Sequence, residues 1–98
     1  MKVRWTHEAL VRLVEIEEFI SRDSPSRARS FVDQIIERAE SLPARPRIGR
    51  VVPEISNPNI RELIFKKHRI VYRVRKDVVE ILTVFEGHRM LRIGEIEE

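Results

Sequence analysis

The sequence predicts an α+β fold, in which an N-terminal strand and an antiparallel two-helix hairpin pack with a mainly antiparallel sheet of three to four strands. Two patterns support this prediction. Apolar residues recur at helical spacing in the first half of the chain, and β-branched residues alternate with polar ones between residues 59 and 89. The length of 98 residues suits a single modest core, so we expect one domain spanning residues 1–98.

The chain begins with a short alternating segment, residues 2–5, which predicts a strand beside the sheet. Thr6 follows and can cap a helix, and Glu8 carries a negative charge, which is favourable in the first turn of a helix. The next apolar residues fall on one helical stripe: Ala9, Leu13, Ile16 and Ile20. We therefore expect a helix that begins after Thr6 and buries this stripe.

Three apolar residues of this first helix, Val11, Val14 and Phe19, fall outside the stripe. Isolated apolar residues are common on protein surfaces, which is one interpretation. The other interpretation is that these side chains form part of a surface that binds a partner. Both predict that the three side chains are exposed.

Residues 22–25 interrupt the helical pattern and restart it, because Ser24 can cap a second helix and Pro25 suits its first position. Pro43 ends this helix. Its apolar side is formed by Ala28, Phe31, Val32, Ile35, Ala39 and Leu42. Two amphipathic helices joined by a short turn predict a helical hairpin, whose apolar sides need a sheet face to cover.

The segment 43–50 is rich in proline, arginine and glycine, so it is expected to be a loop. It is either a solvated connector or a flexible basic arm close to an anionic target. Val51 and Val52 can add a short extended piece before Pro53.

Residues 68–75 and 78–85 are typical of two hairpin strands, with a two-residue turn at Lys76-Asp77. This register pairs Arg73 with Glu80. One set of side chains then faces the helices: Ile70, Tyr72, Val74, Val79, Ile81, Thr83 and Phe85. The other set faces away: Arg69, Val71, Arg73, Glu80, Leu82 and Val84. We therefore expect an apolar floor between arginines on the face away from the helices.

The charge balance is basic, with 19 Lys and Arg against 16 Asp and Glu. Between Pro43 and Lys76 lie nine basic residues and two acidic ones, which indicates an anionic partner: RNA, DNA or an acidic protein segment. The absence of cysteine excludes a disulfide framework and cysteine-based zinc sites. No apolar run approaches the roughly 20 residues of a membrane span, and the N-terminus is unlike a signal peptide. We expect a cytoplasmic protein without cofactor, metal site or membrane partner.

A series of short motifs spans nearly the whole chain. They are Trp5-Thr6 with Ala9 and Leu13, Ser24-Pro25 with Ala28 and Phe31, Leu42 before the proline loop, Gly49-Arg50 after it, Arg61-Glu62-Leu63, His68-Arg69-Ile70-Val71-Tyr72-Arg73, and Gly87-His88-Arg89. In order and spacing these motifs resemble the toxins of the RelE/ParE superfamily, from bacterial type II toxin–antitoxin operons. The topology expected from the residue pattern agrees with this resemblance.

Within that superfamily, RelE-like members cut mRNA on the ribosome without a metal. The resemblance would then imply that Arg61, Arg69 and Arg89 hold the phosphate. His88 would assist proton transfer. Arg69 has a second interpretation, a structural ion pair with Glu62 or Glu80.

ParE-like members of the superfamily are described as poisons of DNA gyrase. Beyond residue 89 the chain has neither tyrosine nor histidine, so the proton-transfer set of a ribonuclease is incomplete. The ParE-like branch therefore fits better. The alternatives are a metal-independent, ribosome-dependent endoribonuclease and a degenerate, non-enzymatic member.

The resemblance also implies a cognate antitoxin whose C-terminal segment wraps the toxin. The expected binding residues lie on the sheet face away from the helices and on the first helix: Val11, Val14, Phe19, Arg69, Val71, Arg73, Leu82 and Val84. An apolar floor between arginines suits an amphipathic, acidic segment. The expected target is DNA gyrase, or the ribosome and its mRNA.

Overall fold

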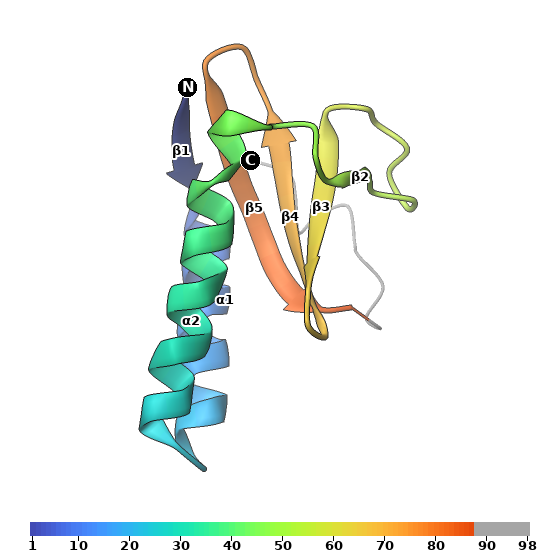
Figure 1. Cartoon of the computed structure of the whole chain (residues 1–98). Coiled ribbons are helices and arrows are strands. Elements are labelled where there is room, and N and C mark those ends of the chain that lie inside the picture. The colour runs from blue at the N-terminus through green and yellow to red at the C-terminus, as the bar shows by residue number, and fades with distance from the viewer. Residues whose placement is uncertain (88–98) are drawn as a thin grey trace.

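In the computed structural model, residues 1–87 are described, and they form two α-helices beside a five-stranded sheet (Figure 1). The strands are β1 (Lys2–Trp5), β2 (Arg50–Val51), β3 (Ile60–Phe65), β4 (His68–Val74) and β5 (Val78–Glu86). The helices are α1 (His7–Ser21) and α2 (Pro25–Glu40), and a 3-10 turn, η1 (Leu42–Ala44), follows α2. The predicted α+β fold class is confirmed.

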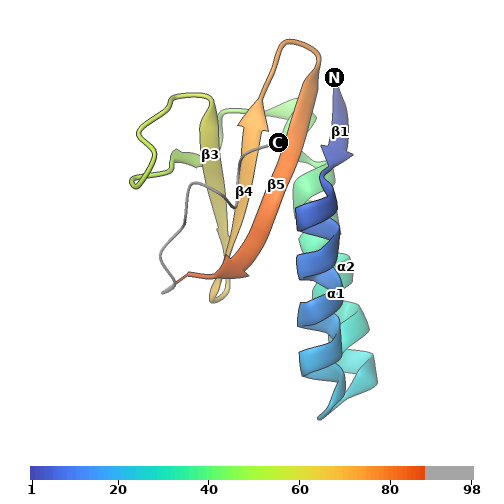
Figure 2. The same cartoon turned by 180° about the vertical axis from the view of Figure 1, so that it is seen from behind.

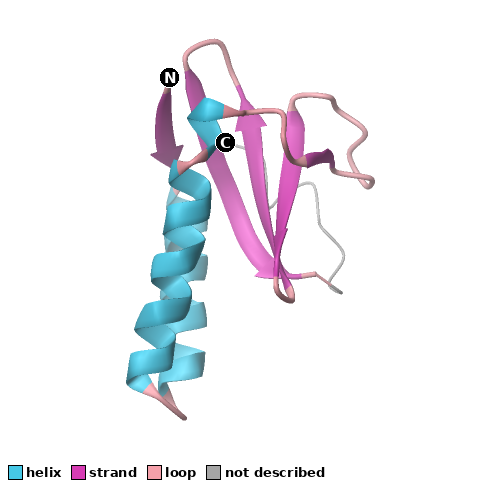
Figure 3. Ribbon diagram, in the orientation of Figure 1, coloured by secondary structure: helices cyan, strands magenta, loops and turns pink. Residues whose placement is uncertain are grey.

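The strand order is β1-β5-β4-β3-β2, with β1 parallel to β5 and all other neighbours antiparallel. The sheet has one strand more than the largest expected number, because Arg50 and Val51 pair with β3. Figure 3 shows the helices and the strands as two layers. Seen from the front and from behind, the helix pair lies on the β1–β5 side and β3 lies farther away (Figures 1 and 2).

Both helices begin where the sequence predicts. Thr6 Oγ1 accepts a hydrogen bond from the Ala9 amide at 3.1 Å, and Ser24 Oγ accepts one from the Arg27 amide at 3.2 Å. Pro25 occupies the first turn of α2, where its missing N–H is not needed. Among the described residues neither helix combines the length and apolar composition that crossing a membrane requires.

The main core lies between the helices and the sheet. Helix residues contribute Ala9, Leu13, Ile35 and Ala39, and the sheet contributes Phe65, Ile70, Tyr72, Val79, Ile81 and Val84, with Leu42 between them. The predicted stripes of both helices therefore cover the predicted strands. Burying each large apolar side chain contributes about 1.5–3 kcal/mol, which makes this layer the main source of stability.

The hairpin of β4 and β5 has the predicted turn. The Arg75 amide donates to the Val78 carbonyl at 2.9 Å, and Arg73 lies opposite Glu80 as the sequence predicts.

Farther along β5, Leu82 is an extra residue that forms a β-bulge. Val71 therefore pairs with Thr83 instead of Leu82. Beyond the bulge the predicted faces are wrong: Val84 belongs to the helix-facing core, and Phe85 to a cluster on the other side. An alternating pattern cannot reveal an inserted residue, because one extra position moves every later side chain to the opposite face.

The sheet face away from the helices is called the distal face below. It carries a second apolar cluster, formed by Val52, Ile60, Val71, Leu82 and Phe85, with Ile55 packed against it. Two of the expected floor residues, Val71 and Leu82, are thus present on this face. Both are buried, so the expectation of an open apolar floor is wrong.

Candidate functional site

Arginines on the distal face form two groups, and each group surrounds one buried glutamate. Strand alternation places them there, because Ile70 and Tyr72 belong to the helix-facing core and their neighbours Arg69 and Arg73 point the other way. On β1 the same alternation directs Arg4 to this face.

Glu62 of β3 is the centre of the first group. Its buried carboxylate accepts hydrogen bonds from Arg50 Nε at 2.5 Å and from Arg69 Nε at 2.6 Å. Arg69 also binds Glu54, on the loop after β2, through Nη1–Oε2 and Nη2–Oε1 distances of 2.9 and 2.8 Å. Hydrogen bonding to Glu54, more than to Glu62, raises the pKa of Arg69, so its guanidinium stays charged. Arg69 is only 5% exposed, and its guanidinium also lies over the Phe85 ring, 5.1 Å from the centroid.

Glu80 of β5 is the centre of the second group. Its carboxylate pairs with Arg4 of β1, with Arg73 of β4 at 3.4 Å, and with Arg75 at 2.6 Å. Burying a carboxylate costs several kcal/mol unless it is paired. Arg4 and Arg75 remain more than half exposed. This group therefore links three strands and still presents guanidinium groups to solvent.

Arg61, the third predicted phosphate ligand, points to the other side of β3. It pairs across the strands with Tyr72, whose side chain lies in the helix-facing core. Its Nε donates to the Pro58 carbonyl and its Nη1 to the Gly49 carbonyl, both at 2.9 Å. Through these hydrogen bonds Arg61 holds the loops before and after β2 against β3. The structure does not bring it together with Arg69.

Tyr72 is buried at the point where the loop before β2 meets the sheet. Its hydroxyl accepts a hydrogen bond from the Gly49 amide at 2.9 Å. Burial raises the pKa of the Tyr72 phenol, and the Gly49 bond together with Arg61 and Arg47 offsets part of that change. The phenol is therefore a neutral structural group at physiological pH.

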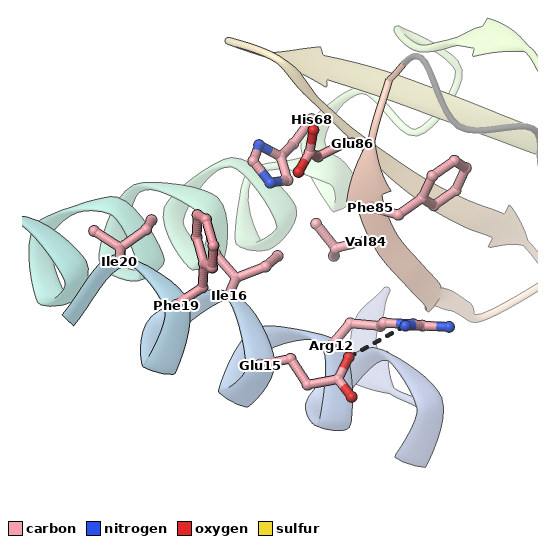
Figure 4. Close-up of a pocket in the computed structure, with 9 residues that line it drawn as sticks. All are labelled: Arg12, Glu15, Ile16, Phe19, Ile20, His68, Val84, Phe85 and Glu86. Atoms are coloured by element: carbon pink, nitrogen blue, oxygen red, sulfur yellow. Dashed lines mark hydrogen bonds and ion pairs between the residues drawn. The ribbon is translucent and has the colours of Figure 1, made fainter. Parts of the chain in front are cut away.

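A groove of about 340 Å³ lies between α1 and the end of the sheet (Figure 4). It is lined by Arg12, Glu15, Ile16, Phe19, Ile20, His68, Val84, Phe85 and Glu86. The His68 ring packs edge-on against Phe31, with centroids 5.1 Å apart. Burial lowers the pKa of His68 below 6.5, although Glu86 offsets part of this effect. An uncharged imidazole therefore borders the groove at neutral pH.

The part of the predicted partner surface on α1 is exposed. Val11, Val14 and Phe19 are 37, 55 and 67% exposed. Leu10 lies on the same helix and is also exposed. α1 thus presents apolar side chains that the main core does not use.

The part of the predicted partner surface on the sheet needs correction. Val71 and Leu82 are buried in the distal cluster, and Val84 faces the helices because of the bulge at Leu82. Arg73 stays at the surface of the second arginine group. His88 and Arg89 lie outside the described residues.

Some residues of the site were missed by reasoning from the sequence. Glu54 binds Arg69 from a loop 15 residues away in the chain, and no local sequence pattern predicts such a contact. Arg4 could have been found, since its neighbours Val3 and Trp5 face the core. Within residues 1–87 no cluster of three histidine, aspartate or glutamate side chains is placed to hold a metal ion.

Residues 3–91 match the family model described as "ParE toxin of type II toxin-antitoxin system, parDE". Over 93 residues, 90% of each chain, the sequence is 38% identical to "Putative toxin Y4kP" of Sinorhizobium fredii (strain NBRC 101917 / NGR234). The fold is similar to a solved structure described as "Chromosomal ParDE TA system from P. aeruginosa". That likeness has a TM-score of 0.73 and 24% identity, and covers 88% of this chain and 95% of the other.

Proposed function

The chain belongs to the ParE toxin family of type II toxin–antitoxin systems, and we therefore propose that it inhibits bacterial growth by poisoning DNA gyrase. We further propose that it acts in the cytoplasm and that a cognate antitoxin neutralises it. The similar fold from P. aeruginosa is described as part of a ParDE system, which supports an antitoxin partner for this chain too.

The binding of Arg69 by two carboxylates of its own chain is the observation that most favours gyrase over mRNA as the target. Metal-free RNA cleavage needs cations that stabilise the phosphorane, a base and an acid. Arg69 is buried between Glu54 and Glu62, so a phosphate would have to displace carboxylates of the same chain. Arg61 is bound to backbone carbonyls on the other side of the sheet. Arg61 and Arg69, the two residues of the predicted ribonuclease set that lie within residues 1–87, therefore have structural roles.

The proposed antitoxin contact combines the arginines of the distal face with the apolar residues of α1. Arg4, Arg50 and Arg75 are each more than half exposed, and each is bound to a buried glutamate that fixes its position. Positioned guanidinium groups favour carboxylates through bidentate hydrogen bonds. An acidic segment with an apolar side, able to reach Val14 and Phe19, suits both parts of this surface.

The target is tested with the purified full-length chain, DNA gyrase and supercoiled plasmid. We expect the chain to suppress supercoiling and to trap cleaved plasmid, while mRNA on translating ribosomes stays intact. A matched reaction adds the neighbouring gene product, which should restore supercoiling. Cleavage of ribosome-bound mRNA with normal gyrase activity would instead identify an endoribonuclease.

The growth phenotype is tested separately. Induction of the chain alone should stop growth and induce the DNA-damage response, and co-expression of an adjacent gene should prevent both. Unimpaired growth, together with unaffected gyrase and mRNA, would point to a degenerate member of the family.

A further inference from the structure

A pocket of about 480 Å³ lies at the end of the sheet where β4 turns into β5 and the loop before β3 approaches it. Four cationic side chains line this pocket: Arg47, Arg73, Arg75 and Lys76. The described lining residues include no carboxylate. The pocket is separate from Arg69 and from the groove beside α1. Arg73 and Arg75 also belong to the arginine group around Glu80, whereas Arg47 and Lys76 have no part in the roles proposed above.

The positive charge of the pocket is only partly balanced by nearby acidic groups. Arg73 and Arg75 share one buried carboxylate, Glu80, with Arg4. Asp77 is the acidic residue of the adjoining turn. Within residues 1–87 the side chain of Lys76 forms no ion pair, so its ammonium group is available to a ligand.

Two asparagines add neutral hydrogen-bond donors to this pocket. Asn59 Oδ1 accepts from Arg47 Nη2 at 3.0 Å, and Asn57 Oδ1 accepts from the Asn59 amide at 2.9 Å. Because both side chains use their oxygen atoms in these bonds, each keeps its NH₂ group as a donor. The Arg47 bond to the Pro58 carbonyl, at 3.2 Å, helps to hold the loop in place.

We propose that this pocket binds a phosphate group of a nucleic-acid backbone. Several cations, together with NH₂ donors in a concave polar site, match the charge and the acceptor oxygens of a phosphodiester. An acidic protein segment fits less well, because such segments dock through apolar contacts as well as charge, and Ile60 and Val74 are the only apolar residues among the described lining. The proposal is independent of which target the toxin poisons.

The test uses the full-length chain and labelled short duplex DNA, with single-stranded RNA as a parallel probe. Lys76→Ala should weaken binding roughly 5–10-fold near 0.1 M salt and lower the slope of log K against log salt by about 1. The matched control is Lys67→Ala, which removes the same charge from the β3–β4 turn and should leave binding unchanged. Thermal unfolding should show that both variants are folded.

A second readout locates the ligand within the pocket. On addition of inorganic phosphate, the NMR signals of the Asn57 and Asn59 side-chain amides should shift in the parent chain and not in Lys76→Ala. If DNA alone, RNA alone or both depend on Lys76, the proposal stands, and the pattern tells which nucleic acid supplies the phosphate.

Three results would overturn the proposal. One is unchanged binding in Lys76→Ala. Another is equal weakening of nucleic-acid binding by Lys67→Ala, which would mean that binding depends on the overall positive charge and not on this pocket. The third is polyglutamate binding with the same Lys76 dependence and greater affinity than DNA, which would make the pocket a protein-binding site.

Discussion

Arg69 and Glu54 lie 15 residues apart in the chain and meet through two parallel hydrogen bonds of 2.8 and 2.9 Å. Glu62 binds the remaining edge of the same guanidinium at 2.6 Å. An external anion can therefore reach Arg69 only by exchange with a carboxylate that the protein itself supplies. This arrangement makes Arg69 a structural residue first, and stability is the property in which its removal will be seen.

Arg69→Ala should lower the free energy of unfolding by about 3–5 kcal/mol, because it leaves the buried Glu62 carboxylate with a largely exposed partner. Urea denaturation measures this loss. The control is Arg50→Ala, which removes the exposed partner of the same glutamate and should cost less than about 1 kcal/mol. Equal costs for the two substitutions would show that burial does not decide the strength of these pairs.

Glu80→Ala should lower the free energy of unfolding by about 1–3 kcal/mol, because it leaves the mostly buried Arg73 guanidinium beside Arg4 and Arg75 without the carboxylate that they share. The rate of amide hydrogen exchange should increase most in β1, which Arg4 connects to Glu80. Arg75→Ala is the control, with an expected cost below about 1 kcal/mol. Unchanged protection of β1 would contradict a linking role for Glu80.

Gly49→Ala should cost about 1–3 kcal/mol, because a Cβ there would lie 2.6 Å from both the Glu62 carbonyl and the Tyr72 hydroxyl. Gly87→Ala is the matched control. Its Cβ would meet the Lys67 carbonyl at 3.4 Å, an ordinary contact, so its midpoint of thermal unfolding should stay close to that of the parent. If both alanines were tolerated, the loop before β2 would have to be more adaptable than its packing indicates.

The stability of the chain should fall as the pH falls through 6.5. Burial lowers the pKa of His68 in the folded state, so below 6.5 the unfolded chain binds more protons and is favoured. Urea midpoints measured about one unit above and one unit below this value should differ more for the parent than for His68→Gln. Identical pH dependence of the two chains would mean that His68 titrates alike in the folded and unfolded states.

Phe19→Ser should weaken the proposed antitoxin complex at least tenfold, because exposed aromatic side chains are frequent anchors of protein interfaces. Stability should change little, since Phe19 is largely exposed. Ile48→Ser removes an exposed apolar side chain from a loop instead and should leave binding unchanged. Calorimetric titration with the purified antitoxin compares the three chains.

Local patterns were sufficient for much of this fold. Thr6 and Ser24 cap the helices as expected, and the pair Arg73–Glu80 was placed correctly because both residues lie close to the turn that sets the register. The bulge at Leu82 could not be foreseen, since it inserts one residue without disturbing the local composition. Its effect reaches Val84, which was assigned to the partner surface and is part of the core.

The site was less predictable than the fold, because it depends on contacts between distant segments. For Arg69 the sequence predicts either a phosphate ligand or an ion pair with Glu62 or Glu80, but it does not predict Glu54, which comes from a loop without regular periodicity. Arg61 was assigned to the same phosphate site. The pairing of β3 with β4, which the sequence left open, directs it to the opposite face.

The position of β1 has a consequence for biosynthesis. Its neighbour in the described sheet is β5, and Thr6 at its end donates to the Leu82 carbonyl, 76 residues later in the chain. During translation the first strand and both helices emerge before the strands that complete the core with them. A chain interrupted before residue 78 lacks the strand that joins β1 to the sheet, so we expect it to leave the core incomplete and to be open to proteases.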